Sequence, residues 1–406
     1  MRDFSKSTDN RTPARDVEIT GVETCVVEGN VDWNLVKVCT DAGVVGIGEA
    51  YRGSNVVDLM AYMERFLIGE NPLDVERLLR LLIQETSGHG GTTGKVVTAA
   101  SGIEIALWDA AGKLLDVPVY QLLGGKYRDA VRVYADCHAG EALAVNDGSQ
   151  AYHGEHVYAP DAYAAEAKRA VEKGFTALKF DLDIPLDNEP DPFNGRIDNE
   201  SLYRKVEIVE AVRETVGDEL DLAFDCHWEY SLDSAKRLAK ALEPYDLMWL
   251  EDVLPSENIT AQREVARSTS TPLAAGENRF RVHEFRELLY DFSVDVVTPD
   301  PTTCGGLAES KAIASRAEEN YIVFSPHNVC SPVGTIACAH LAAAVANFGV
   351  LEYHALGIEW WDDLLARNDP LVQDGYVEIP EAPGLGIELD EAVVEDHAKA
   401  DGSAFV

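Results

Sequence analysis

The sequence predicts a (β/α)8-type barrel preceded by a smaller α+β domain. From Val131 onward, eight short apolar segments alternate with amphipathic helical ones, which favours a closed barrel over an open sheet. Before that point, strand signals come first and helical signals follow. Of the 406 residues, 46% are hydrophobic, so the chain can bury cores of this size.

Residues 1–128 form the predicted α+β domain. Alternating apolar residues punctuated by glycines predict strands within 16–50. Two amphipathic segments within 54–87, divided by an Asn-Pro pair, predict helices. A long apolar helix is expected over 94–116, ending before Pro118.

Residues 129–361 form the predicted barrel domain. Its strands are expected at 131–138, 177–183, 220–227, 247–252, 273–278, 294–300, 321–328 and 350–354. Helices are expected between them, at 161–173, 200–216, 232–243, 258–268, 281–290 and 305–319. Two polar insertions, 139–160 and 184–198, follow the first two strands and are expected on the active-site face. Residues 362–406 carry strand and turn signals and are expected to pack back on the N-terminal domain.

The charge balance excludes several partners. The 71 Asp and Glu residues outnumber the 34 Lys and Arg residues, which gives a net charge of −37. Such a surface repels nucleic acids and anionic membranes, because binding to either needs cationic side chains. Only thirteen of the cations are Lys, and this acidic, Lys-poor composition is typical of proteins that work at high salt, where repulsion is screened. An ordinary acidic protein is the alternative.

The sequence also indicates a cytoplasmic protein. Its seven cysteines are scattered and form no C-x-x-C pair, which favours free thiols in a reducing compartment over disulfides or a zinc cluster. The N-terminus lacks the apolar stretch of a signal peptide, and no apolar run reaches the roughly 18 residues of a membrane span.

Charged or hydrogen-bonding residues end nearly every predicted barrel strand. In chain order they are Lys179, Asp225 with His227, Glu251, Glu277, Asp300, His327 and Glu352. From Asp225 onward they recur every 23 to 27 residues, about one per β/α unit. Because the carboxyl ends of barrel strands meet at one mouth, these side chains are expected to converge there.

Three carboxylates on consecutive strands, Asp225, Glu251 and Glu277, predict a metal site. Held so close together, they need a cation to offset their charge. Oxygen ligands without Cys or paired His favour Mg²⁺, and one ion per subunit is expected. Chance placement of acids in an acidic chain is the alternative.

Two histidines have the surroundings of proton-transfer groups. His327 and Asp300 end neighbouring strands, so the carboxylate is expected to orient the imidazole as a general base. His227 lies two residues after Asp225, on the same face of its strand, which makes it a candidate general acid. Lys179 would stabilise negative charge on a substrate oxygen beside the metal. A structural role is the alternative for each histidine taken alone.

Together these motifs resemble the enolase superfamily, and within it the mandelate racemase-like group of acid-sugar dehydratases. The resemblance covers essentially the whole chain. Its motifs are GIGEA (46–50), ASGIEIALWDAAGKLLDVPVYQLLGG (100–125), LKFD (178–181), FDCHWEY (224–230), LED (250–252), AGEN (275–278), TPD (298–300), SPHN (325–328) and LEYH (351–354). It implies a (β/α)7β barrel, an N-terminal capping domain completed by the C-terminal segment, and a homo-oligomer between a dimer and an octamer.

The resemblance also implies a role for each site residue. The correspondences are Asp225, Glu251 and Glu277 to the Mg²⁺ ligands, Asp300 and His327 to the catalytic dyad, and Glu352 to an acid that contacts substrate. Lys179 corresponds to the first lysine of the racemases' K-x-K motif, whereas Asp181 replaces the second lysine and its own role is open. His227 resembles the histidine that protonates the leaving hydroxyl in sugar-acid dehydratases.

The implied reaction is dehydration of a five- or six-carbon aldonate to a 2-keto-3-deoxy acid. His327 would remove the α-proton, Mg²⁺ and Lys179 would stabilise the enediolate, and His227 would protonate the departing 3-hydroxyl. Xylonate and gluconate are the first candidate substrates, with arabinonate and galactonate still open. The alternatives are an acid-sugar racemase or epimerase that uses His227 as a second base, and a non-catalytic acid-sugar-binding protein.

Substrate identity is expected to depend on the N-terminal domain, which closes over the barrel mouth in this family. The polar loops 29–34 and 51–55 are the candidate lids. The candidate contacts with distal hydroxyls are Trp33, Tyr51 and Arg52. An ordinary exposed loop residue is the alternative for each of the three. His354, Trp360 and Trp361 follow the last strand and are expected either to line the site or to pack in the core.

Overall fold

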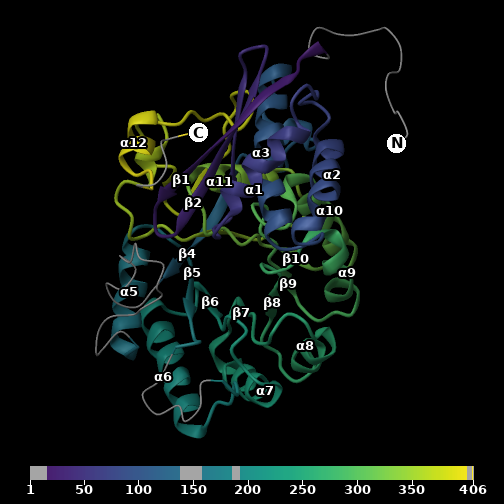
Figure 1. Ribbon diagram of the computed structural model, residues 1–406. Coiled ribbons are helices and arrows are strands. Elements are labelled where there is room, and N and C mark those ends of the chain that lie inside the picture. Colours follow the sequence, from purple (N-terminus) through teal and green to yellow (C-terminus); the bar gives the residue numbers. More distant parts are fainter. Residues whose placement is uncertain (1–15, 138–157, 185–192, 400–404, 406) are drawn as a thin grey trace.

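The structure is a computed structural model that describes residues 16–137, 158–184, 193–399 and 405. Figure 1 shows a domain of strands and helices, drawn at the top, and below it a ring of strands surrounded by helices. Most of the predicted insertion 139–160 lies outside the described residues, as does the middle of the insertion 184–198.

The N-terminal domain combines an antiparallel sheet with helices. Its strands, in the order β1-β2-β3, are β1 (Ile19–Glu28), β2 (Asp32–Thr40) and β3 (Val45–Ala50). Its helices are α1 (Val56–Met63), α2 (Val75–Thr86), α3 (Lys95–Leu115) and α4 (Val119–Leu122), with the short 3-10 helices η2 (Glu64–Phe66) and η3 (Ser87–His89). The order of strands and then helices agrees with the α+β prediction.

Glycines allow α3 to lie directly on the sheet. A Cβ atom at Gly46 would lie 2.0 Å from the carbonyl oxygen of Ala106, and one at Gly48 would lie 2.3 Å from that of Gly102. Only glycine permits so close an approach of strand and helix backbones. The GIGEA motif therefore fixes how β3, and Glu49 within it, is seated against α3.

In the described part of the chain, eight parallel strands close a barrel. They are β4 (Ala130–Cys137), β5 (Ala177–Asp181), β6 (Asp221–Asp225), β7 (Trp249–Glu251), β8 (Leu273–Ala275), β9 (Val296–Val297), β10 (Val323–Phe324) and β11 (Leu351–Tyr353). Each strand pairs with the next from β4 to β10, and β11 pairs with β4. A parallel bridge between Phe324 and Phe348 joins β10 to the residues before β11. The predicted barrel is confirmed.

Helices surround the barrel (Figure 1). They are α5 (Pro160–Glu172), α6 (Asn199–Val216), α7 (Leu232–Ala241), α8 (Ile259–Ala266), α9 (Arg281–Tyr290), α10 (Gly306–Glu319) and α11 (Pro332–Ala343), with the 3-10 helix η4 (Glu243–Tyr245) after α7. Side chains of Asp198, Asn258 and Ser331 accept hydrogen bonds from backbone N–H groups at the starts of α6, α8 and α11. Such caps satisfy donors that have no partner within the helix.

The barrel strands are shorter than the sequence predicts. The segments 294–300 and 321–328 each contain only a two-residue strand. Beyond the paired residues, some backbone groups bond to side chains: the Thr302 N–H donates to Asp300, and the Asn328 N–H donates to Glu352. Asp300 and His327, which follow these two strands, therefore lie in loops at the barrel mouth.

The segment after β11 contacts both domains. It contains η5 (Asp362–Leu364), the hairpin of β12 (Val372–Gln373) and β13 (Tyr376–Glu378), and α12 (Glu391–Asp396). β13 pairs antiparallel with β4 of the barrel. Ala398 forms a bridge with Val27 of β1, and Lys399 Nζ lies 2.7 Å from Asp32 Oδ2. In Figure 1 this yellow segment lies beside the purple strands β1 and β2.

Two buried carboxylates of the N-terminal domain bind the starts of barrel helices. Glu49 of β3 accepts hydrogen bonds from the backbone N–H groups of Ser331 (3.0 Å) and Gly334 (2.8 Å) at the start of α11. Glu104 of α3 accepts from the N–H groups of Leu307 (2.8 Å) and Ala308 (3.0 Å) in the first turn of α10. Because α10 follows Asp300 and α11 follows His327, these contacts connect the N-terminal domain to the predicted dyad.

Among the described residues, no helix combines the length and the apolar character needed to cross a bilayer. All seven cysteines are free thiols, and six of them are buried.

Candidate active site

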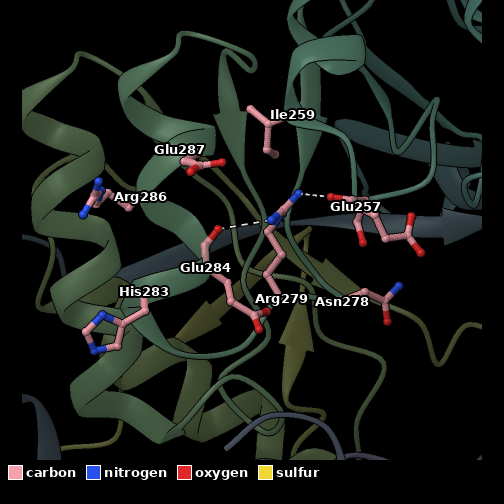
Figure 2. A pocket seen from close by; sticks show the side chains of 9 residues that line it. Glu257, Ile259, Asn278, Arg279, His283, Glu284, Arg286 and Glu287 are labelled. Carbon is pink, nitrogen blue, oxygen red and sulfur yellow. Dashed lines mark hydrogen bonds between the residues drawn. The ribbon is translucent and has the colours of Figure 1, made fainter.

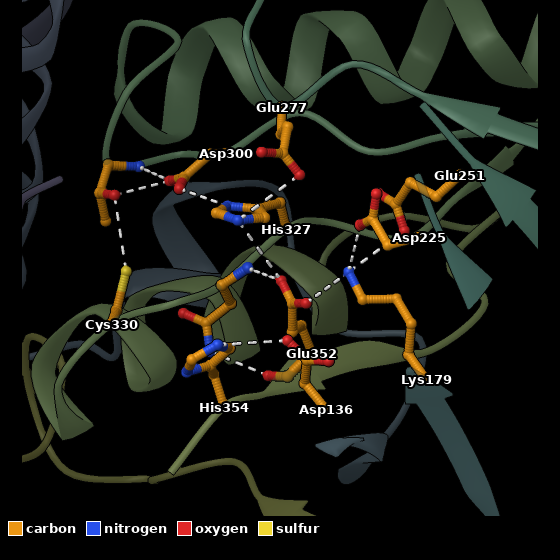
Figure 3. Close-up of polar contacts among 12 residues, drawn as sticks. Asp136, Lys179, Asp225, Glu251, Glu277, Asp300, His327, Cys330, Glu352 and His354 are labelled. Atoms are coloured by element: carbon orange, nitrogen blue, oxygen red, sulfur yellow. Dashed lines mark hydrogen bonds and ion pairs between the residues drawn. The ribbon is translucent and has the colours of Figure 1, made fainter. Parts of the chain in front are cut away.

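The carboxylates of Asp225, Glu251 and Glu277 lie together at the barrel mouth (Figure 3). Asp225 and Glu251 are paired across β6 and β7, and Glu277 follows the end of β8 by two residues. Each carboxylate offers an oxygen within 4.8 Å of the others. We refer to these three residues as the carboxylate cluster.

The cluster has the charge and the free oxygens that a divalent cation needs. Burial, opposed by Lys179 and reinforced by Asp225 and Glu277, raises the pKa of Glu251 to about 7. Burial also raises the pKa of Glu277. Oε1 of Glu251 is buried and accepts no hydrogen bond in the described structure. Three carboxylates, one of them with an oxygen that accepts no hydrogen bond from the described residues, are suitable ligands for a hard divalent ion, so the cluster is a candidate metal site.

Lys179 extends from β5 into the carboxylate cluster (Figure 3). Its Nζ lies 3.1 Å from Asp225 Oδ2, 3.2 Å from Glu251 Oε2 and 2.8 Å from Glu352 Oε1. Burial alone lowers the pKa of a lysine, but these carboxylates outweigh it and hold the pKa of Lys179 well above its ordinary value. Lys179 is therefore a fixed positive charge beside the candidate metal site.

His327 and Asp300 form a hydrogen-bonded pair. Nδ1 of His327 lies 2.7 Å from Asp300 Oδ2, and the other oxygen of Asp300 accepts from the N–H (2.7 Å) and the hydroxyl (2.6 Å) of Thr302. Nε2 of His327 faces the carboxylate cluster, 3.6 Å from Glu277 Oε2. The imidazole therefore has one nitrogen held by a fixed carboxylate and the other directed at the candidate metal site.

The charges around His327 also affect its protonation. Burial lowers its pKa, but Glu277 and Glu352 outweigh burial and raise the pKa to about 10. A cation in the carboxylate cluster would offset these negative charges and lower that pKa toward neutrality, where a histidine can act as a base.

Glu352 of β11 lies between Lys179 and His327. Its Oε2 accepts a 2.7 Å hydrogen bond from the Asn328 N–H and lies 3.8 Å from His327 Nε2. Burial would raise the pKa of Glu352, but Lys179 and His327 together hold it below its ordinary value. Glu352 is therefore ionised and fixed at the predicted substrate position.

His227 follows the end of β6 by two residues and lies beside the carboxylate cluster. Its Nδ1 is 3.1 Å from Asp183 Oδ2 and 4.0 Å from Asp181 Oδ1, and its Nε2 is 3.9 Å from Asp225 Oδ2. Burial lowers the pKa of His227, but Asp225 and Asp183 outweigh it and raise the pKa to about 12. Sequence reasoning missed Asp183. The signal was available, because Asp181 and Asp183 alternate at the end of a predicted strand.

The predicted lid residues are placed differently from one another. The ring of Tyr51 meets the His327 ring edge-on, with 5.5 Å between centroids, so Tyr51 lies at the site. Arg52 is exposed, with its guanidinium 5.6 Å from the Tyr51 ring centroid. Trp33 is only 1% exposed and packs edge-on against Trp360. Burial favours a packing role for Trp33, and its contact with substrate stays a prediction.

The loop 29–34 reaches the barrel mouth through Asn30. The Trp33 indole N–H donates to Asn30 Oδ1 (3.1 Å), and Asn30 Nδ2 lies 2.5 Å from His354 Nδ1. His354 Nε2 lies 3.3 Å from Asp136 Oδ2, and Figure 3 shows this pair beside Glu352. Sequence reasoning singled out His354 but not Asn30 or Asp136, because no motif links residues so far apart in the chain.

A separate hollow of about 600 Å³ lies beside the loop after Glu277 (Figure 2). Arg279 crosses it and donates to the backbone carbonyls of Ser256 and Glu284. His283 also lines it. Its lining residues include no member of the carboxylate cluster, so this hollow is distinct from the candidate active site.

The arrangement defines a class of barrel enzymes in which separate strands supply a metal site and proton-transfer groups to one mouth. Residues 19–124 match the "Mandelate racemase / muconate lactonizing enzyme, N-terminal domain", and residues 162–393 match the "Enolase C-terminal domain-like" family. The chain belongs to the mandelate racemase/muconate lactonizing enzyme group of the enolase superfamily. The resemblance inferred from the sequence is confirmed.

Similar curated proteins are dehydratases of sugar acids. A D-xylonate dehydratase of Haloferax volcanii is 50% identical over 98% of this chain and 94% of its own length. A D-gluconate dehydratase of Thermoproteus tenax is 32% identical over 89% of this chain and 69% of its own. The crystal structure of a mandelate racemase/muconate lactonizing enzyme-like protein from Rubrobacter xylanophilus matches with a TM-score of 0.92 and 44% identity, covering 96% of this chain and all of that one.

Proposed function

We propose that this protein is a sugar-acid dehydratase, a hydro-lyase that converts an aldonate to a 2-keto-3-deoxy acid, with D-xylonate as the favoured substrate. One observation carries the proposal: His327 and His227 each direct Nε2 toward the carboxylate cluster while an aspartate lies at Nδ1. Elimination of water needs one base and one acid at the same substrate. The 50% identity to a D-xylonate dehydratase supports the choice of substrate.

The carboxylate cluster would hold one Mg²⁺ ion, whose charge supplies polarisation of the substrate carboxylate. His327 would accept the α-proton at Nε2 while Asp300 holds its ring. Lys179 would stabilise the negative charge that then develops on a substrate oxygen, because it is a buried, fixed cation. Glu352 would contact the substrate between these two groups.

His227 would protonate the departing 3-hydroxyl. The C2–H and C3–O bonds break, water leaves, and the resulting enol takes a proton at C3 to become the 2-keto acid. Asp181 occupies the position of the second lysine of racemases, and an aspartate there is a far weaker base. This replacement favours dehydration over racemisation.

The lid residues would select the substrate by its distal hydroxyls. Tyr51 is best placed for this role because its ring packs against His327. Arg52 would reach the same region from beside Tyr51, and Trp33 would act through Asn30, which it holds.

A panel of acid sugars tests the reaction and its substrate. The protein, supplied with Mg²⁺, is incubated with xylonate, gluconate, arabinonate or galactonate, and keto acid is measured with semicarbazide. We expect xylonate to give the highest kcat/KM. The same incubation in D₂O separates the alternatives, because deuterated and configurationally scrambled substrate without keto acid would indicate a racemase or epimerase and contradict this proposal.

A His327→Asn variant tests the assigned base. We expect it to bind substrate but to lose about 10²- to 10⁴-fold in kcat, the usual contribution of a general base. His283→Asn is the matched control, since His283 is exposed and lies outside the site. Turnover that is equal in His327→Asn and His283→Asn would refute the role of His327.

We also propose that the enzyme works in the cytoplasm as a homo-oligomer. The seven free thiols support a reducing compartment. Light scattering of the purified protein tests the assembly, and a monomer at micromolar concentration would contradict it.

A further inference from the structure

We propose that Asp183 is a positioning residue for His227, which it orients so that Nε2 addresses the substrate at the carboxylate cluster. The inference rests on the proposed function, in which His227 is the acid. Asp183 Oδ2 lies 3.1 Å from Nδ1, within hydrogen-bond distance, whereas Asp181 Oδ1 is 4.0 Å away. On the other side of the ring, Nε2 lies 3.9 Å from Asp225 Oδ2.

The backbone that carries Asp183 is fixed from several directions. The N–H of Leu182 donates to the Asp225 carbonyl at 2.7 Å. Lys205, which is 1% exposed, donates to the carbonyls of Leu182 (2.9 Å) and Ile184 (3.2 Å). The Tyr230 hydroxyl also donates to the Leu182 carbonyl. Burying an ammonium group is unfavourable unless it is hydrogen-bonded, and hydrogen bonds from a charged donor are strong. The bonds from Lys205 to two carbonyls therefore hold this turn in one conformation.

The backbone of His227 is fixed as well, in a conformation that few residues adopt. His227 and Trp228 have φ values of 38° and 63°, in the left-handed region. The His227 N–H donates to Asp225 Oδ1 at 3.0 Å, and the Trp228 N–H donates to the Asp252 carbonyl at 2.7 Å. Such strain is commonly held at functional sites. These backbone hydrogen bonds fix the position of the His227 Cβ. The rotation of the ring then depends on the group that hydrogen-bonds to Nδ1.

The dyad gives an independent comparison within the same molecule. Asp300 holds Nδ1 of His327 at 2.7 Å, and Nε2 of His327 faces Glu277 at 3.6 Å. Asp183 and His227 repeat this arrangement at a different edge of the carboxylate cluster. A carboxylate at Nδ1 favours the tautomer and ring orientation that leave Nε2 for chemistry.

The alternative for these side chains is a second metal site. Asp181, Asp183 and His227 each offer an atom within 4.8 Å of the others. A metal there would occupy the nitrogen or carboxylate that we assign to orientation. The two assignments differ in metal content, which makes the alternative testable.

Asp183→Ala is the direct test, with Asp183→Asn as an isosteric second variant and Asp233→Ala as the control at an exposed aspartate. We expect Asp183→Ala to lower kcat for dehydration by about 10- to 100-fold, the usual effect of removing a carboxylate behind a functional histidine. Exchange of the C2 proton of xylonate in D₂O depends on His327, and should stay within about threefold of the unchanged protein. Equal losses of dehydration and exchange would indicate a merely structural role and overturn the proposal, as would no loss of either.

Two further measurements do not depend on activity. A crystal structure of Asp183→Ala is expected to show the His227 ring rotated or in several orientations on an unchanged backbone, whereas an unmoved ring would contradict the inference. Bound Mn²⁺, counted by electron paramagnetic resonance, is expected to be one per chain in both proteins. Two ions in the unchanged protein and one in the variant would assign the second metal site instead. If no acid sugar is dehydrated by the unchanged protein, the proposed function fails while the ring orientation is still tested.

Discussion

Lys179 lies among carboxylates that would repel one another without it. Its Nζ is within 3.2 Å of oxygens from Asp225, Glu251 and Glu352. The same charge has two opposing effects on function, since it stabilises an anionic substrate and competes with a cation for the cluster.

We expect Lys179→Met to lose about 10²- to 10³-fold in kcat, because one electrostatic donor is removed from the reacting oxygen. We expect it to bind Mg²⁺ at least as tightly as the unchanged protein, because the cluster becomes more negative. Kinetics with xylonate and calorimetric titration with Mg²⁺ measure the two effects. Lys173→Met, at an exposed lysine, is the control, and weaker Mg²⁺ binding by Lys179→Met would contradict the assignment.

Metal binding should depend on pH through Glu251. Its pKa of about 7, raised chiefly by burial, means that the carboxylate carries a proton over much of the range below neutrality. A cation must displace that proton, so the apparent Mg²⁺ affinity is expected to fall as pH decreases from 8 to 6, with protons released on binding. Titration calorimetry in two buffers of different ionisation enthalpy measures this release. Heats that are identical in both buffers would contradict it.

At the residue scale, the sequence predicts best those residues whose positions follow from the regular spacing of the barrel strands. Asp225, Glu251, Asp300 and His327 could be found because one polar residue ends each strand of a barrel. The strand period also places Asp183 two residues after Asp181, but its contact with His227 could not be predicted, because β5 pairs only as far as Asp181. The burial of Trp33 was missed because the sequence analysis placed it in a loop, whereas it lies in β2, paired with Val27.

At the scale of elements, the N-terminal domain is joined to the barrel by carboxylates that bind helix starts. Glu49 also accepts a 2.5 Å hydrogen bond from the Ser331 hydroxyl, so three donors converge on it. An anion at a helix N-terminus is favoured by both the free N–H groups and the helix dipole. Sequence patterns do not predict such contacts, because each joins an element of one domain to an element of the other.

We expect Glu49→Gln to lower the free energy of unfolding by about 1–3 kcal/mol at pH 6, because an amide group would face donors that need an acceptor. Burial raises the pKa of Glu49 to about 7, against the hydrogen bonds from Ser331 and Gly334. A raised pKa in the folded state means that protonation stabilises the fold. That contribution is complete below about pH 4.5 and is lost as pH rises through about 7.

The stability difference between the unchanged protein and Glu49→Gln should therefore shrink from pH 5 to pH 8. Denaturant unfolding at several pH values, in constant high salt, measures this difference. Glu76→Gln, at an exposed position in the first turn of α2, is the control and should change stability by less than about 0.5 kcal/mol. A difference that grows with pH would contradict the assigned pKa shift.

Strand positions could be predicted at this scale, and strand lengths could not. Seven of the eight barrel strands lie within their predicted segments, and β4 begins one residue before its own, because apolar runs between amphipathic helices are specific to this architecture. The predictions were too long where polar residues such as those of 298–300 continue an apolar run. Asp300 instead bonds to the side chains of Thr302 and His327 at the mouth, and that environment exists only in the closed barrel.

At the scale of the whole molecule, most of the charge lies away from the active site. Only a few of the 71 acidic residues belong to the carboxylate cluster and its neighbours. The rest contribute to a net charge of −37. Repulsion between exposed charges extends over a Debye length of only about 3 Å at molar salt, but of about 10 Å at 0.1 M.

We therefore expect the melting temperature to fall when KCl is lowered from 2 M to 0.1 M. A variant in which Glu207, Glu210 and Glu214 of α6 are all replaced by Gln should show a weaker dependence on salt, since these exposed acids lie along one helix. Thermal unfolding followed by circular dichroism measures both proteins. Equal stability of the unchanged protein across this range would refute adaptation to high salt and leave the catalytic assignments unaffected.

The contacts of the last described segment have a consequence for biosynthesis. β13 pairs with β4, and Ala398 and His397 bond to the backbone of β1, so early strands find these partners only when residues 376–398 have been made. On the ribosome, β1 and β4 would each present an open edge for most of translation, and open edges pair readily with other chains. We expect the N-terminal domain to complete its folding only after residues 376–398 have left the ribosome.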